Sequence, residues 1–214
     1  MSKTLGLYVH IPFCRSKCDY CDFYSLAGRE DRMDDYQKAL IAQISEGAPL
    51  ARGYTVNSIY IGGGTPSWYG EKRLCELLRL LQKKFKMAKD IEVTVEANPD
   101  SVTEKALRAV RRAGVNRLSL GMQSACDQEL QDVHRPHTFQ QVVEAVHAAR
   151  KAKIKNLNLD LIYGLPGQTE ESWHNSVEQA IALGPEHLSC YGLTVEDGTP
   201  LAGRVARGER LPGD

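Results

Sequence analysis

Three cysteines near the start of the chain are the residues with the clearest chemistry. Cys14, Cys18 and Cys21 have the spacing C-x3-C-x2-C and follow a short apolar run that Pro12 ends. A loop of this length can fold around one [4Fe–4S] cube and offer three thiolates to three irons, which leaves the fourth iron without a protein ligand. Two other interpretations stay open: a zinc site that takes a fourth ligand from elsewhere in the chain, and three buried structural cysteines.

An open iron predicts that a small molecule completes the cube. S-adenosylmethionine (SAM) can chelate such an iron through its amino and carboxylate groups, and one electron from the cluster then breaks its sulfonium C–S bond to give a 5′-deoxyadenosyl radical. In such chemistry the cofactors carry the reaction, and the protein supplies position and shielding. Most Fe–S electron carriers instead close their cube with a fourth cysteine. The cysteine pattern therefore favours a SAM site over an electron relay.

A glycine run supplies a second element of this site. Ile61 is followed by Gly62, Gly63, Gly64 and Thr65, and consecutive glycines let a backbone approach a ligand closely and present its N–H and C=O groups. We expect the amino group of SAM to lie there, and Thr65 to cap the turn that follows. A tight turn without any ligand is the alternative interpretation.

Charged and polar residues end three further apolar runs. Glu96 and Asp160 would be costly to bury without partners, and the amino group, sulfonium and ribose hydroxyls of SAM are suitable partners. Gln123 could share the ribose, and Arg135 could pair with the SAM carboxylate. The alternative is internal pairing of Arg135 with Glu96 or Asp160.

These residues must be positioned by six short β-type runs that alternate with helical patterns. The predicted strands are 6–11, 58–61, 91–97, 116–121, 157–163 and 187–193, and the predicted helices are 34–45, 73–85, 103–113, 139–152 and 170–183. This alternation predicts parallel neighbours joined by right-handed crossovers. We expect an α/β fold, an incomplete (β/α)6 TIM-like barrel rather than a doubly wound sheet, because polar or glycine-rich residues follow every strand at its carboxyl end.

Composition restricts the partners and the compartment. The 214 residues carry 27 basic and 27 acidic side chains, so charge gives no argument for binding nucleic acid or an anionic membrane. The apolar stretch at the start is too short for a signal peptide or a transmembrane segment, and we expect a cytoplasmic protein with reduced cysteines. Cys75 and Cys190 are expected in the core.

Taken together, these motifs resemble the oxygen-independent coproporphyrinogen III oxidase family of radical SAM proteins, and within it the heme chaperone (HemW-like) branch. The resemblance covers nearly the whole chain. It rests on residues 8–14 (YVHIPFC), 18–23 (CDYCDF), 62–66 (GGGTP), 95–99 (VEANP), 117–123 (RLSLGMQ) and 158–169 (NLDLIYGLPGQT).

The resemblance implies a partial barrel of the radical SAM type and a specific set of site residues. Cys14, Cys18 and Cys21 would bind the cluster. The implied SAM contacts are Tyr8, Tyr20, Gly63, Gly64, Thr65, Glu96, Gln123, Arg135, Asp160 and Thr194. Of these, Tyr8, Tyr20 and Thr194 are assigned by the resemblance and not by the residues' own pattern, and no catalytic residue is assigned.

The chain also departs from the family pattern. Phe23 stands where the oxidase has a fourth cysteine, which favours the chaperone branch, and His134 replaces the glycine of a leucine-glycine-arginine pattern while Arg135 is kept. The resemblance implies that both branches continue into a C-terminal domain, and that in the chaperone branch the heme-associated motif lies there. We expect residues 1–200 to form the radical SAM core and 201–214 to begin a C-terminal region missing from this chain.

The function that this resemblance implies is that of a heme chaperone, which binds heme and delivers it to apo-proteins. The first alternative is coproporphyrinogen III oxidase, which decarboxylates its substrate oxidatively to protoporphyrinogen IX. The second is an Fe–S electron-transfer module. The expected partners are SAM, heme or a porphyrinogen, an electron donor and heme-receiving apo-proteins, without nucleic acid.

Overall fold

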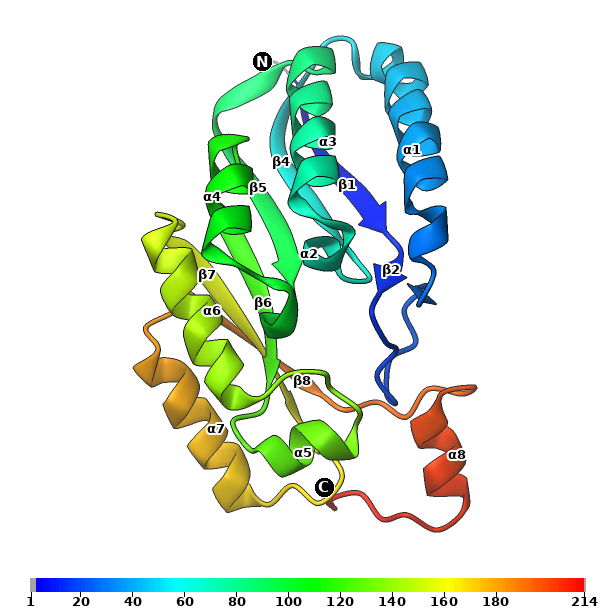
Figure 1. The fold of residues 1–214 in the computed structure, drawn as a ribbon, viewed down its shortest axis with the longest axis vertical. Helices are drawn as coiled ribbons and strands as arrows, with labels where there is room; N and C mark the ends of the chain where they lie inside the picture. The colour runs from blue at the N-terminus through cyan, green and yellow to red at the C-terminus, as the bar shows by residue number, and fades with distance from the viewer. Residues whose placement is uncertain (1–2, 214) are drawn as a thin grey trace.

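Six parallel strands in sequence order form the frame of the protein, for which a computed structural model describes residues 3–213 (Figure 1). They are β1 (Lys3–Ile11), β4 (Tyr54–Gly63), β5 (Met87–Ala97), β6 (Arg117–Gln123), β7 (Asn156–Tyr163) and β8 (His187–Gly192). All six predicted strands are confirmed. Because β1 and β8 are the two edges of the sheet, the barrel is open, as the predicted partial barrel requires.

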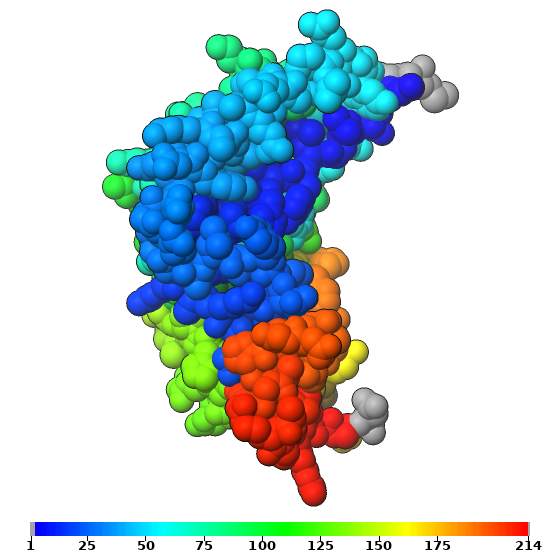
Figure 2. Space-filling view, turned by 90° about the vertical axis from the view of Figure 1, so that its right-hand side faces the viewer, coloured from blue at the N-terminus to red at the C-terminus, as the bar shows by residue number. Residues whose placement is uncertain are grey.

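Helices cover one face of this sheet, and the apolar core lies between the two layers. The predicted helices correspond to α1 (Met33–Gly47), α3 (Glu71–Lys84), α4 (Glu104–Arg112), α6 (Phe139–Lys151) and α7 (Glu170–Ala182). Buried strand residues such as Ile61 and Leu159 belong to this core. Seen from the side, the molecule is a crescent with a hollow on the sheet's other face (Figure 2). Residues 3–213 hold no helix long and apolar enough to span a membrane.

Threonine caps explain where several helices begin. The hydroxyl of Thr103 accepts from the Ala106 N–H at 3.1 Å at the start of α4. Thr138 and Thr169 form capping boxes at the starts of α6 and α7. These hydroxyls satisfy amide groups that the helices leave unpaired, and so fix the loops that precede each helix.

The short elements were not predicted, because two to seven residues are too few to show a period. They are β2 (Phe13–Cys14), β3 (Leu26–Ala27), α2 (Pro66–Tyr69), α5 (Asp127–Asp132), α8 (Pro200–Ala206) and the 3-10 turns η1 (Glu30–Arg32), η2 (Ala48–Ala51) and η3 (Pro99–Ser101). β2 and β3 pair with each other at the two ends of the cysteine loop. Most of these elements lie near the carboxyl end of the sheet (Figure 1).

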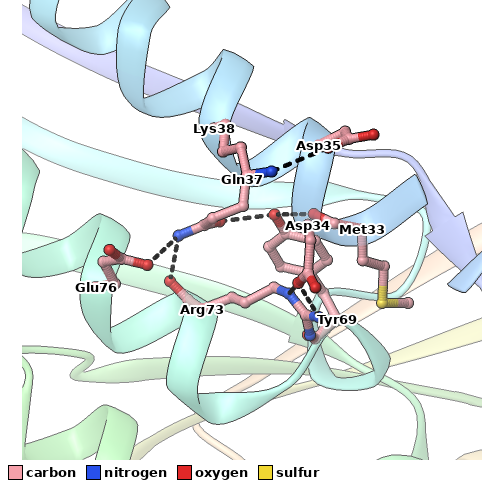
Figure 3. A network of polar contacts seen from close by, with 8 residues as sticks. All are labelled: Met33, Asp34, Asp35, Gln37, Lys38, Tyr69, Arg73 and Glu76. Atoms are coloured by element: carbon pink, nitrogen blue, oxygen red, sulfur yellow. Dashed lines mark hydrogen bonds and ion pairs between the residues drawn. The ribbon is translucent and has the colours of Figure 1, made fainter. Parts of the chain in front are cut away.

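A polar network holds α1 against α2 and α3 (Figure 3). The Tyr69 hydroxyl donates to Gln37 Oε1 at 2.6 Å, Gln37 Nε2 donates to Glu76 at 2.8 Å, and Arg73 pairs with Asp34 at 2.6 Å. The ring of Tyr69 stacks on Phe13, with centroids 5.5 Å apart. The network therefore fixes the aromatic support beneath the strand that carries Cys14.

The two remaining core predictions have different outcomes. Cys75 is buried in α3, as expected, whereas Cys190 is exposed and the expectation for it is wrong. Cys190 lies on β8, which has a neighbouring strand on one side only. The sequence of an apolar strand does not show that the strand lies at a sheet edge, so the exposure of Cys190 could not be predicted.

Candidate functional site

A cavity of about 480 Å³ opens at the carboxyl ends of the strands, and it brings the predicted site residues together. All but one of them line it: Cys14, Cys18, Tyr20, Cys21, Gly63, Gly64, Thr65, Glu96, Gln123, Arg135, Asp160 and Thr194. The exception is Tyr8, which is 61% exposed and reaches the site only indirectly, by stacking on Tyr60 at 6.1 Å. The carboxyl end is where parallel α/β barrels assemble their sites.

Backbone hydrogen bonds attach the cysteine loop to the glycine run. Gly64 N donates to Ile11 O at 2.8 Å and Thr65 N donates to Phe13 O at 2.7 Å. The Thr65 hydroxyl lies 3.4 Å from Cys14 Sγ and makes no capping hydrogen bond to α2, so the predicted cap is wrong and the hydroxyl serves the cysteine instead. Burial raises the pKa of the Cys14 thiol.

The arrangement of the thiols bears on the alternatives that the cysteine spacing left open. Within residues 3–213, no group of three His, Cys, Asp or Glu side chains is placed to hold a single metal ion. In a cube, each thiolate binds a different iron. Burial is the main cause that raises the pKa of the Cys14 and Cys21 thiols, and the charge of the nearby Cys18 also raises both values.

Arg135 connects the cysteine loop to the sheet. Its Nη1 lies 3.4 Å from Cys18 Sγ and 3.5 Å from the Tyr20 hydroxyl, while its Nη2 donates to Asn98 Oδ1 and to Gly121 O, both at 2.9 Å. Although burial opposes it, the Tyr20 and Cys18 groups hold the pKa of Arg135 above its ordinary value. One guanidinium therefore contacts both the second cysteine of the loop and the carboxyl ends of the strands.

Glu96 is held by two hydrogen bonds, and no cationic side chain in residues 3–213 forms an ion pair with it. Its carboxylate accepts from the Tyr60 hydroxyl at 2.6 Å and from Gly63 N at 3.0 Å. Burial raises the pKa of Glu96, and these two hydrogen bonds oppose the rise. The carboxylate borders the cavity and is suited to receive the amino group of a ligand.

The glycine run fits a ligand cradle for two distinct reasons. Gly63 has a φ of 113°, in the region that side chains rarely adopt, and a Cβ there would meet the His10 ring at 2.5 Å. A Cβ on Gly64 would meet the main chain of Phe13 and Ile11 at 2.8 and 2.9 Å. The lack of a Cβ at these two glycines therefore lets the cysteine loop pack against the glycine run, and it also keeps the backbone accessible from the cavity.

Gln123 and Asp160 complete the opposite wall. Gln123 has a φ of 65° at a register shift between β6 and β7, and its Oε1 is buried without a hydrogen-bond partner among the residues that the structure describes. Asp160 accepts from Ser119 at 2.8 Å and from Asn158 at 2.8 Å. Non-glycine residues in this backbone region occur often at ligand sites, and the unpaired oxygen of Gln123 is suited to a ligand hydroxyl.

The internal ion pairs that the sequence left open are not formed. Among residues 3–213, neither Glu96 nor Asp160 lies within ion-pair distance of Arg135, whose partners are an amide, a carbonyl, a thiol and a phenol. Glu96, Asp160 and Arg135 thus border one cavity without forming ion pairs with one another. Such a set is suited to a ligand that carries both an ammonium and a carboxylate group, as SAM does.

The residues that hold the charged groups of the site in place were missed. Tyr60, Asn98 and Ser119 hold Glu96, Arg135 and Asp160 respectively. Tyr60 lies two residues before Gly62, Asn98 two residues after Glu96, and Ser119 two residues before Gly121. Because residues two apart in a strand face the same side, this spacing could have identified all three.

Comparisons with known proteins agree with this geometry. The family model described as Radical SAM superfamily matches residues 8–180. The heme chaperone HemW of Mycobacterium tuberculosis (strain CDC 1551 / Oshkosh) is 40% identical over 97% of this chain and 54% of the relative, and that of Escherichia coli (strain K12) is 40% identical over 94% and 53%. The structure is similar to that of the E. coli coproporphyrinogen III oxidase HemN, with a TM-score of 0.90 and 31% identity over 99% of this chain and 49% of that one. This chain spans about half the length of these relatives.

Proposed function

This protein belongs to the radical SAM superfamily, and on that premise we propose that Cys14, Cys18 and Cys21 bind a [4Fe–4S] cluster whose open iron takes SAM in the adjoining cavity. A [4Fe–4S] cluster and SAM are the cofactors of this superfamily, and together they supply one-electron cleavage of the SAM sulfonium bond. The cavity at the three cysteines, with the charged side chains that border it, is the observation that supports this assignment.

The residues of the cavity would divide the recognition of SAM between them. Glu96, fixed by Tyr60 and Gly63, would accept a hydrogen bond from the amino group. Arg135 would donate to the carboxylate while it keeps its contact with Cys18. Gln123 Oε1 and Asp160 would accept hydrogen bonds from the ribose hydroxyls. Each of these contacts orients the ligand without taking part in bond cleavage.

A comparison of single variants tests the cluster and SAM assignments. The parent protein, reconstituted without oxygen, should contain about four irons per chain, and Cys18→Ala should lose most of them. Glu96→Gln should keep the iron content and weaken SAM binding, measured by the change that SAM causes in the EPR spectrum of the reduced cluster. Full iron content in Cys18→Ala would contradict the ligand assignment, and an unchanged SAM response in Glu96→Gln would contradict its role.

We further propose that the protein acts in heme metabolism as a heme chaperone, which binds heme and delivers it to apo-proteins. The identity of about 40% with curated heme chaperones over nearly the whole chain carries this proposal. Phe23, which is 71% exposed beside the cysteine loop, supports it, since the oxidase pattern has a fourth cysteine there.

The likeness to HemN makes coproporphyrinogen III oxidation the second candidate. Heme and coproporphyrinogen III should therefore be offered separately to the reconstituted protein with SAM and a reductant. Stoichiometric heme binding and transfer to an apo-protein, without protoporphyrinogen formation, is the result expected of a chaperone. Turnover of coproporphyrinogen III would favour the oxidase instead.

A further inference from the structure

Asp19 lies inside the cysteine loop, between Cys18 and Tyr20, and is only 6% exposed. Its main-chain N–H and C=O groups are both hydrogen-bonded: Asp19 N donates to Val133 O at 3.1 Å, and Leu201 N donates to Asp19 O at 3.0 Å. Two segments remote from the loop in sequence therefore meet at this residue.

The carboxylate of Asp19 also needs partners, because burial of an unpaired charge is unfavourable. Its Oδ2 accepts from Arg204 Nη1 at 2.8 Å, and its Oδ1 lies 2.9 Å from His134 Nδ1. The arginine is partly buried, whereas the His134 side chain is 71% exposed. Arg204 is thus the better shielded of the two partners of this charge.

Arg204 is itself held from several directions. Its Nη1 also donates to Asp132 O, and its Nε and Nη2 donate to the Glu209 carboxylate at 2.6 and 2.5 Å. The guanidinium therefore joins α8, the end of α5 and the cysteine loop. An arginine fork held in this way loses little additional freedom when it binds a further carboxylate.

The first turn of α8 fixes the position of this helix through a capping hydrogen bond and a buried side chain. The Thr199 hydroxyl accepts from Ala202 N at 3.2 Å, and Leu201 in the first turn is completely buried. Figure 1 shows α8 beside the lower end of the cysteine loop, and in Figure 2 the red C-terminal segment lies directly against the blue N-terminal part. A segment at the end of the described chain is thus part of the loop's surroundings.

His134 has an unusual backbone conformation in this corner of the fold. Its φ of 54° is in the left-handed region that a side chain adopts at a cost. Its ring faces the Asp19 carboxylate at 2.9 Å. The unusual residue therefore contacts the same buried carboxylate as Arg204.

We propose that α8 is a latch on the cysteine loop, in which Arg204 binds Asp19 and thereby determines how long the loop retains its cluster. Arg204 is a positioning residue in this scheme, because it contacts neither a cysteine nor the cavity. The latch holds the segment between the second and third cysteines against α8 and the 132–134 turn, so that release of iron requires the Asp19–Arg204 contact to open first. This inference rests on the cluster assignment proposed above.

The first test compares iron loss from matched arginine variants. Arg150 is the control, since it also bridges a carboxylate, Glu186 at 3.1 Å, and carbonyl groups, but lies at the opposite end of the strands. Arg204→Gln should release iron to a chelator about tenfold faster than the parent, the effect of losing one charge-assisted hydrogen bond from a segment that opens locally. Arg204→Lys, which keeps the cation, should release iron at a rate between those of the parent and Arg204→Gln. Arg150→Gln should release iron at the rate of the parent. Equal rates in the parent and Arg204→Gln would overturn the latch.

The second test uses cluster-free protein and so does not depend on the cluster. Mass spectrometry should find that iodoacetamide modifies Cys18 several-fold faster in Arg204→Gln and in the isosteric Asp19→Asn than in the parent, while far-UV circular dichroism stays native. The double variant should be no faster than either single variant, since both remove the same contact. Unchanged alkylation in both single variants would overturn the latch, whereas failure of the parent to bind iron would overturn only the cluster assignment.

Discussion

At the scale of single residues, Glu129 on α5 is a buried carboxylate stabilised by hydrogen bonds alone. It accepts from Ser124 Oγ at 2.6 Å, Gln168 Nε2 at 2.9 Å and Ser172 Oγ at 2.5 Å. These donors belong to the loop after Gln123 and to the loop and helix after β7. One side chain therefore joins the two loops that follow the Gln123 and Asp160 strands.

We expect Glu129→Ala to lower the free energy of unfolding by about 2 to 3 kcal/mol, because it leaves three donors without their acceptor. Glu129→Gln, which keeps one oxygen, should cost less. Denaturant titration measures both, with Glu144→Ala on the exposed face of α6 as a control expected to change stability by less than about 0.5 kcal/mol. A loss no larger than that of the control would contradict the role given to Glu129.

His137 makes a second prediction at this scale. Burial, assisted by the Arg135 charge, lowers the pKa of His137 from 6.5 to about 3. Its Nε2 forms a hydrogen bond with Met122 O at 3.1 Å, and its Nδ1 is buried with no hydrogen-bond partner in the described part of the chain. The neutral ring is therefore the form that the fold accommodates.

Because the unfolded chain protonates this ring near pH 6.5 and the folded protein only near pH 3, acid favours unfolding in that window. His137 should contribute a loss of up to about 1.4 kcal/mol per pH unit as the pH falls through it. The slope of unfolding free energy against pH should be shallower in His137→Gln than in the parent. Identical slopes would show that the folded ring takes up its proton as easily as the unfolded one.

Sequence reasoning worked for residues whose type and strand position both carry information. Cys14, Glu96 and Asp160 combine reactive groups with the carboxyl ends of apolar strands, and the structure brings them to one cavity. Asp19 and Arg204 could not be paired from the sequence, because 185 positions separate them and neither lies in a recognisable pattern. Tyr8 was assigned to the site from resemblance alone, and it lies outside the cavity lining.

At the scale of elements, length decided what could be predicted. Each long strand and helix was found because its apolar period repeats, whereas β2 and α2 have two and four residues and depend on contacts made elsewhere. The junction of β2 with the end of β4 is the point where such contacts matter most for the site. Gly64 lies at this junction.

We expect Gly64→Ala to displace β2 from β4, because the new Cβ would meet main-chain atoms that cannot rotate away. Reconstituted Gly64→Ala should bind less than about half the parent's iron, since Cys14 lies on the displaced strand. Gly47→Ala is the matched control: it lies in α1 with open space around it, and should be neutral or stabilising by up to about 1 kcal/mol. Normal iron content in Gly64→Ala would mean that β2 tolerates the shift.

At the scale of the whole molecule, the open sheet predicts which free thiols react. Cys190 on the edge strand β8 is exposed, and Cys75 on the inner face of α3 is buried. In native protein, a maleimide should modify Cys190 while Cys75 stays unmodified. In denaturant, the two cysteines should be modified at equal rates. Cys190→Ser identifies the reactive site by removing its signal. Fast modification of Cys75 in native protein would show that the helix layer opens easily.

The contact between Arg204 and Asp19 has a consequence for biosynthesis. The two residues are 185 positions apart, so a ribosome adding about 5 to 20 residues per second needs roughly 10 to 40 s to pass from one to the other. During that interval all three cysteines have been made, and the helix that contacts their loop has not. The nascent chain thus has a period in which an iron–sulfur donor can reach the thiols, and the synthesis and folding of α8 end it.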